Sequence, residues 1–113
     1  MRVYVASRLR RFLWQGRERG EAANLAHARQ LVRAVALLGH EPYAPHVAMA
    51  GVLDDLVPAE REAGIRTGLR WLACADELWF DSTFGISEGM AGELEEAARL
   101  GLRIVQAWTE SVP

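Results

Sequence analysis

Short apolar runs alternate along the chain with longer segments in which apolar residues recur at helical spacing. The run Arg-Val-Tyr-Val-Ala at residues 2–6 is β-branched and aromatic, which is typical of a buried strand. Between residues 22 and 38 the apolar period is close to 3.6, which predicts an amphipathic helix closed by Gly39. The same reasoning predicts a short edge strand at 40–46, strands at 77–81 and 103–107, and helices at 59–75 and 87–100.

These elements alternate between strand and helix, beginning and ending with a strand. Such alternation builds a parallel sheet covered on both faces, because each parallel pair of strands needs a crossover. We therefore expect an α/β protein with a three-layer Rossmann-like (flavodoxin-like) architecture, in which a mainly parallel sheet of four to five strands is flanked by helices. No internal repeat is visible, so residues 1–113 are expected to form a single domain.

Two segments lie outside this alternation. Residues 7–21 are polar and arginine-rich and are expected to form a long loop, and residues 47–58 are expected to be irregular. Within the helix predicted at 59–75, Gly64 and Gly68 lie four residues apart, and each costs about 1 kcal/mol relative to alanine. This cost indicates that another part of the chain packs closely against that backbone.

Composition narrows the class of protein. The chain has 113 residues, 50% of them hydrophobic and 25% charged, and its formal net charge is −2. These values are typical of one globular domain, and the mild acidity argues against a dedicated nucleic-acid binder. A single cysteine, Cys74, excludes an intramolecular disulfide, and no apolar stretch approaches the length of a membrane span. We expect a cytoplasmic protein without a membrane partner.

Positive charge is concentrated near the amino terminus. Residues 1–33 carry eight arginines against two glutamates, whereas residues 34–113 carry five arginines against thirteen acids. The first third of the chain is therefore expected to face an anion. Its arginines Arg8, Arg10 and Arg11 could bind a phosphate group bidentately or form a solvated basic loop.

The apolar residues of the same loop, Phe12, Leu13 and Trp14, also have two interpretations. They could close over a base by stacking, or they could bury themselves against the domain or a partner subunit.

In an open parallel sheet, ligands bind beyond the carboxyl ends of the strands, near the point where the strand order reverses. At this edge, His46 could donate a hydrogen bond to a base or sugar, or it could serve only as a turn residue. His27 is expected on the surface of a helix, and His40 at the end of one. No metal and no other cofactor are expected, since no histidines and carboxylates have convincing metal-ligand spacing. The residues predicted at this edge are Ala6, Ser7 and Arg8 after the first strand, Pro45 and His46 after the second, Asp81 and Ser82 after the third, and Trp108 after the last.

The start of the helix at 87–100 carries the sharpest chemical signal. Ser87 is a good N-cap, and the backbone N–H groups of Gly89 and Met90 are expected to point into the crevice, favouring an anion or a sugar hydroxyl. Glu93 lies four residues after Gly89, so its side chain leans over the gap above that glycine. The alternative is a serine-capped helix with an ordinary surface glutamate in its second turn.

The segment Ser87-x-Gly89-x-x-x-Glu93, which follows Ala75-Asp76 and a strand ending in Asp81, resembles the hallmark of the nucleoside 2-deoxyribosyltransferase superfamily. This superfamily includes the 2′-deoxynucleoside 5′-phosphate N-hydrolases. Further segments resemble an uncharacterised bacterial and phage family usually placed beside those enzymes, and together they span nearly the whole chain. They are Val3-Tyr4-Val5-Ala6, Asn24, Gly39-His40, Ala44-Pro45-His46, Leu53-Asp54-Asp55, Cys74-Ala75-Asp76-Glu77-Leu78-Trp79 and Ser87-x-Gly89-Met90.

The resemblance implies an activity. In the superfamily, the glutamate matching Glu93 attacks the anomeric carbon of a deoxyribosyl group, and water or an incoming base resolves the glycosyl-enzyme. The acid matching Asp81 lies near the bound sugar, and the segment matching Ser87 and Gly89 holds the 5′ hydroxyl or 5′ phosphate. Superfamily members assemble as dimers or larger, and four tryptophans suggest surplus apolar surface, so we expect at least a homodimer.

One position departs from the family pattern. The hydrolases place a catalytic aspartate eight residues before the aspartate matching Asp76, and that position is Gly68 here. The proton donor is then absent or comes from elsewhere, and the candidates are Asp54, Asp55, Glu60 and Glu62.

Three functions remain open at this point. The first is an enzyme acting on the N-glycosidic bond of a nucleoside or nucleotide through Glu93. The second is a non-catalytic nucleotide-binding module that has lost the general acid. The third is an interaction protein that uses the arginine-rich loop.

Overall fold

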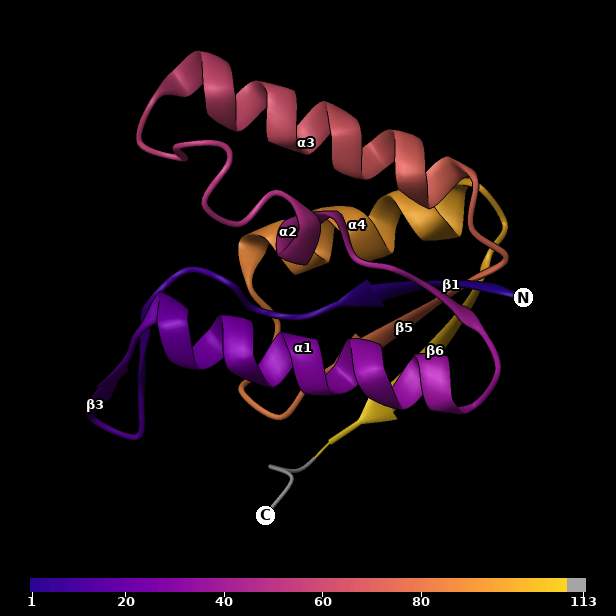
Figure 1. Cartoon of the computed structure of the whole chain (residues 1–113), viewed down its shortest axis with the longest axis horizontal. Helices are drawn as coiled ribbons and strands as arrows, with labels where there is room; N and C mark the ends of the chain where they lie inside the picture. Colours follow the sequence, from indigo (N-terminus) through magenta and orange to yellow (C-terminus); the bar gives the residue numbers. More distant parts are fainter. Residues whose placement is uncertain (110–113) are drawn as a thin grey trace.

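The computed structural model describes residues 1–109, and its main element is a four-stranded parallel sheet. The strands of this sheet are β1 (Arg2–Ala6), β4 (Glu41–Tyr43), β5 (Glu77–Asp81) and β6 (Arg103–Trp108). The helices are α1 (Glu21–Leu37), α2 (Pro45–Ala48), α3 (Pro58–Ala73) and α4 (Glu88–Arg99). Figure 1 shows α1 on one side of the sheet and α3 and α4 on the other, which confirms the expected three-layer α/β architecture.

The strand order is β4-β1-β5-β6, and all neighbouring strands are parallel. The chain first moves from β1 through α1 to β4, and it then crosses back over β1 to reach β5 on the other side. The order therefore reverses between β1 and β5, which is where doubly wound sheets bind their ligands. Ala6 pairs with Phe80 at this point, so the residues that follow β1 and β5 emerge side by side.

The alternation of side chains along β1 divides the core into two halves. Tyr4 and Ala6 pack in one buried cluster with residues of α3 and α4, whereas Val3 and Val5 pack in another with residues of α1. All four side chains are buried, so the backbone of β1 is held from both faces. This places the Tyr4 hydroxyl on the α4 side of the sheet.

The prediction of a long loop at residues 7–21 was wrong. The segment contains an antiparallel hairpin of β2 (Phe12–Trp14) and β3 (Arg17–Arg19). The turn residues Gln15 and Gly16 have φ values of 52° and 75°, and positive φ at both central residues matches the twist that two-residue hairpin turns need.

The strand predicted at 40–46 is shorter than expected. Strand β4 ends at Tyr43, and Pro45 begins the short helix α2, because proline has no N–H to leave unpaired and its φ suits the first helical turn. As a result, His46 lies in a helix and not at a strand end.

Candidate active site

Helix α4 begins at the carboxyl edge of the sheet with the cap that the sequence predicts. The Ser87 hydroxyl oxygen accepts a hydrogen bond from the Met90 N–H at 3.1 Å. One detail of the expectation is therefore wrong, since the Met90 amide is already paired and its side chain is 1% exposed in the core. Gly89 is exposed, and a Cβ added there would meet only the Ser87 hydroxyl, at 4.0 Å. The space above Gly89 is open.

Glu93 follows one turn later, and its carboxyl group lies against the Tyr4 hydroxyl of β1. Glu93 is half-buried, and this burial raises its pKa to about 7, so it is not an ordinary surface glutamate. The Tyr4 hydroxyl opposes this shift by hydrogen bonding to the ionised carboxylate. Burial and the neighbouring Glu93 charge both raise the pKa of Tyr4, so the tyrosine keeps its proton.

The Tyr4 hydroxyl also fills the space beside Gly68. A Cβ at Gly68 would lie 3.4 Å from the Tyr4 hydroxyl oxygen and 3.7 Å from the Pro45 ring. The close packing predicted for this part of α3 is confirmed. Tyr4 thus lies between Glu93 and Gly68, and Gly68 is the position at which the resemblance predicts an aspartate. Sequence reasoning missed Tyr4, because a tyrosine inside an apolar strand looks like a core residue.

The four acids considered as replacement proton donors are held elsewhere or exposed. Asp55 forms an ion pair with Arg10 at 3.7 Å, and Asp54 accepts a hydrogen bond from the Leu56 N–H at 2.9 Å. Glu60 accepts one from the Asp54 N–H at 3.3 Å, and Glu62 is exposed. Among residues 1–109, none of these four has an interaction with Tyr4 or Glu93.

Ser7 and His46 are brought together from β1 and α2. The Ser7 hydroxyl and His46 Nε2 share a hydrogen bond at 2.9 Å. Burial lowers the pKa of His46 to about 4, so its imidazole is neutral near pH 7. Ala6, directly before Ser7, is fully buried. The pair supplies a neutral hydrogen-bonding group at the end of β1.

Asp81 occupies the end of β5, as expected, but its carboxylate is engaged inside the fold. One oxygen accepts from the Thr83 N–H at 3.0 Å and from the Thr83 hydroxyl, and the other contacts His27 Nε2 at 2.7 Å. The Asp81 and His27 side chains are only 3% and 12% exposed. The expectation that His27 lies on the helix surface was therefore wrong.

Two of the three loop arginines have acidic partners. Arg10 pairs with Asp55 and Arg11 with Glu18, at 3.7 and 3.2 Å. Arg8 instead rests on the Phe12 ring, 4.3 Å from its centroid, and its buried Nε has no hydrogen-bond partner within residues 1–109. A Cβ at Gly85, two residues before the α4 cap, would lie 3.7 Å from Arg8. Arg8 thus lies close to the segment that leads into α4.

Within residues 1–109, no group of three or more His, Cys, Asp and Glu side chains could hold a metal ion. No helix in the same part of the chain is long and apolar enough to cross a membrane.

Residues 1–107 match the model of a family described as a domain of unknown function, DUF7768. The chain belongs to this family. No curated protein matches it. Among solved structures, it is similar to a 2-deoxyribosyltransferase from the psychrotolerant bacterium Bacillus psychrosaccharolyticus, with a TM-score of 0.60 and 21% identity. The similarity covers 92% of this chain and 69% of that enzyme, and at this identity it establishes a shared fold.

Proposed function

We propose that this DUF7768 protein acts on the N-glycosidic bond of a deoxynucleoside or deoxynucleoside 5′-monophosphate, with Glu93 as nucleophile. The observation that carries the proposal is the desolvated Glu93 carboxyl group, held by Tyr4 one turn after an open glycine position on α4. A carboxylate that has lost part of its hydration is a stronger nucleophile than one in bulk water. The similarity of fold to a 2-deoxyribosyltransferase supports the same chemistry.

The reaction divides into two displacements at C1′. A Glu93 oxygen bonds to C1′ while the bond to the base nitrogen breaks, and the base leaves with that electron pair. Water, or the nitrogen of an incoming base, then attacks C1′ and releases the carboxylate. Tyr4 keeps its proton and positions Glu93. Because Gly68 provides no acid, the departing base takes its proton from water.

The Glu93 pKa of about 7 determines how the reaction depends on pH. Only the ionised carboxylate attacks, so the rate of base release rises with pH through about 7 and then levels off.

The test uses chromatography to measure the release of free base from the common deoxynucleosides and their 5′-monophosphates. Glu93→Gln should lower the rate at least about 1,000-fold, equivalent to about 4 kcal/mol of transition-state stabilisation. Glu95→Gln is the matched control, because Glu95 is exposed on the same helix. Intact mass spectrometry should detect a deoxyribosyl adduct on the wild type and none on Glu93→Gln. Cleavage that survives in Glu93→Gln would exclude this mechanism.

The second candidate is a nucleotide-binding module without turnover, and the absence of an acid at Gly68 favours it. Such a module is stabilised by its ligand by RT ln(1 + [L]/Kd), about 2.7 kcal/mol at a hundredfold excess over Kd. A ligand-dependent rise in Tm with no base released would support this candidate. Base release that depends on Glu93 would exclude it.

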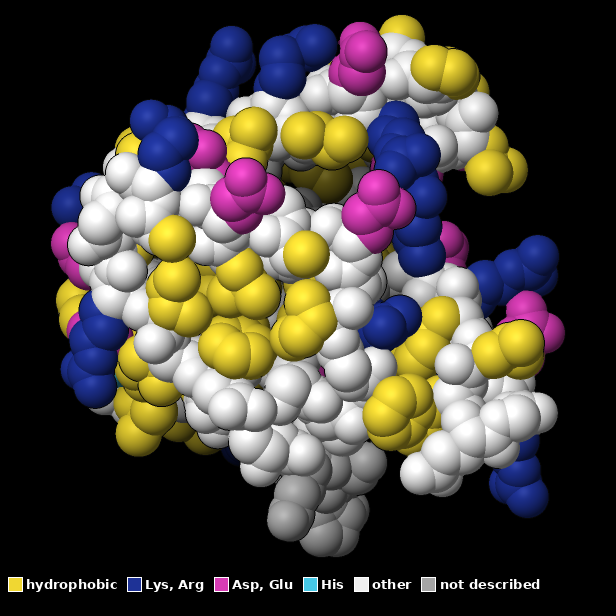
Figure 2. Space-filling model, turned by 180° about the vertical axis from the view of Figure 1, so that it is seen from behind, with side chains coloured by type: hydrophobic (Ala, Val, Ile, Leu, Met, Phe, Trp, Pro, Cys, Tyr) yellow, Lys and Arg dark blue, Asp and Glu magenta, His cyan; other side chains and the backbone are white. Residues whose placement is uncertain are grey.

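We also propose that the protein is at least a homodimer. Ile65 and Leu69 on α3 are 53% and 39% exposed, which leaves apolar surface for a second copy. Figure 2 shows further apolar side chains gathered on the face where α4 and the β6 edge lie. Light scattering at micromolar concentration tests the mass, and Leu69→Glu should shift a dimer toward the monomer. A monomeric wild type would refute this assembly.

A further inference from the structure

The β2–β3 hairpin forms a pocket that the proposed reaction does not use. The hairpin, the first turn of α1 and Phe84 line an open pocket of about 510 Å³, a volume in the size range of small-molecule sites. Cross-strand partners in a hairpin share a face, so the pairs Phe12–Arg19 and Trp14–Arg17 lie on one side of it. Leu13 pairs with Glu18 on the other side and is 74% exposed.

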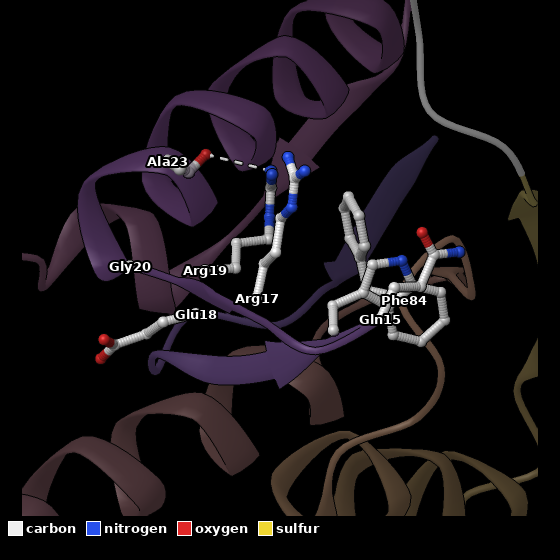
Figure 3. A pocket seen from close by; sticks show the side chains of 8 residues that line it. Gln15, Arg17, Glu18, Arg19, Gly20, Ala23 and Phe84 are labelled. Carbon is white, nitrogen blue, oxygen red and sulfur yellow. Dashed lines mark hydrogen bonds between the residues drawn. The ribbon is translucent and has the colours of Figure 1, made fainter.

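Two arginines, Arg17 and Arg19, line the pocket, and Glu18 is the one carboxylate among its lining residues. Figure 3 shows the Arg17 and Arg19 side chains extending in the same direction beside the first turn of α1, with Glu18 turned away. Glu18 is already engaged by Arg11, at 3.2 Å. Within residues 1–109, neither Arg17 nor Arg19 forms an ion pair.

The Arg19 guanidinium is held in place by neutral groups. Its Nε donates to the Asn24 side-chain oxygen at 2.8 Å, and a second nitrogen donates to the Ala23 carbonyl at 3.4 Å. Its Cζ lies over the Phe84 ring, 4.1 Å from the ring centroid. These contacts fix the position of the group without cancelling its charge. Two like charges on one face repel each other, and an anion bound between them would turn this repulsion into two charge-assisted hydrogen bonds.

Aromatic rings form the rest of the wall. Trp14 and Phe84 meet edge to face, with centroids 5.6 Å apart, and both line the cavity. Trp14 is only half-buried, so part of its indole remains available to a planar ligand. A pocket that combines guanidinium groups with an available aromatic ring suits a molecule with a phosphate at one end and a base at the other.

We propose that the hairpin pocket binds a nucleotide, with its phosphate at Arg17 and Arg19 and its base against Trp14. This site is separate from Glu93 and does not depend on the proposed reaction. The nucleotide phosphate has two sources, a free mononucleotide or a single strand of DNA, and the experiment distinguishes them.

The experiment titrates the full chain with thymidine 5′-monophosphate, thymidine and a short oligothymidylate, using calorimetry and tryptophan fluorescence. Arg17→Gln should weaken binding of the monophosphate about tenfold, the loss expected for one charge-assisted hydrogen bond. Arg17 is exposed, so the variant should fold normally. Arg33→Gln is the matched control, because Arg33 is exposed on α1 but does not line the pocket. Trp14→Phe should remove the fluorescence change.

Oligothymidylate binding more tightly than the monophosphate, with an affinity that falls steeply with salt, would identify the DNA strand as the source. Equal affinities of the protein for oligothymidylate and for the monophosphate would identify the free nucleotide as the source. Either of these two results supports the proposal. The effect of Arg17→Gln should persist in a Glu93→Gln background, so loss of base release alone would not affect this inference. Equal affinity of Arg17→Gln and wild type for both phosphate ligands, or equal affinity of the wild type for thymidine and its monophosphate, would overturn it.

Discussion

Glu93 and Arg17 lie in segments that each follow a strand of the sheet, β5 and β1, but the surroundings of the two residues differ. Glu93 lies on a twelve-residue helix against a central strand, and burial changes its proton affinity. Arg17 lies on a three-residue strand and is exposed. The two regions meet where Trp14 comes within 3.9 Å of a Cβ built at Gly85, just before α4.

The difference in burial between Glu93 and Arg17 suits the two charged groups to different tasks. A carboxylate deprived of water has a changed pKa and greater reactivity, which suits bond making. A solvated guanidinium keeps its charge at every physiological pH and suits capture of an anion. The segment from Asp81 to Ser87 connects the two regions, since Phe84 lines the hairpin pocket and Ser87 caps α4.

The largest expected effect comes from removing the carboxylate that anchors this connecting segment. Asp81→Ala leaves His27 and Thr83 without their buried partner, and it should lower the free energy of unfolding by about 3 kcal/mol. Asp76→Ala is the control, since Asp76 is exposed at the other end of β5 and its loss should cost much less stability. Urea denaturation measures both. Equal costs for the two variants would show that Asp81 does not anchor the segment.

The second prediction uses the sign of the Glu93 shift. The folded-state pKa, about 7, lies above the ordinary value, so the folded protein binds more protons than the unfolded chain between about pH 4.5 and 7. Glu93 therefore lowers stability as pH rises through this window. Between pH 4.5 and pH 8, the stability of Glu93→Gln relative to wild type should rise by about 3 kcal/mol, measured by urea denaturation at each pH. Glu95→Gln should show no such difference, and a constant effect of Glu93→Gln would contradict the assigned burial.

The third prediction isolates Tyr4. Its hydrogen bond favours the ionised form of Glu93, so Tyr4→Phe should raise the pKa of Glu93 further, by roughly one pH unit. Carboxyl-carbon NMR of labelled glutamate measures this directly, whether or not the protein turns over substrate. Tyr43→Phe is the control, because Tyr43 contacts Trp71 and Arg2. Nucleotide binding at the hairpin should be the same in both variants. An unchanged Glu93 titration in Tyr4→Phe would show that the tyrosine does not position the carboxylate.

The fold was predictable because the four strands of the sheet have strong local signals. The strand predicted at 77–81 is found with those bounds, and the predicted helices end within two residues of α1, α3 and α4. The burial of apolar strands and amphipathic helices can be predicted from the spacing of apolar residues within each element. The hairpin has no such signal, since each strand has three residues and its turn has Gln15 at positive φ where asparagine or glycine is usual.

The candidate site was only half predictable, for a related reason. The Ser87 cap and the position of Glu93 follow from spacing within one helix. The contacts of Tyr4 with Glu93 and Gly68, and of His27 with Asp81, join residues far apart in the chain. A single sequence gives no local pattern for such pairs, because each depends on the packing of whole elements.

The smallest expected effects come from replacing one glycine in each of the two regions by alanine. Gly16 in the hairpin turn has φ of 75°, whereas Gly92 lies inside α4, and an added Cβ meets nothing within 4 Å at either position. Gly16→Ala should therefore lower stability by about 1 kcal/mol through backbone strain alone, and Gly92→Ala should raise it by about the same amount through helix propensity. Thermal denaturation followed by circular dichroism should show Tm shifts of opposite sign, about 4–8 °C each. The double variant should lie near wild type, since the two sites share no contact. A Gly16→Ala variant as stable as wild type would mean that the hairpin is not part of the cooperative fold, and the Arg17–Arg19 pocket would then lose its rigid wall.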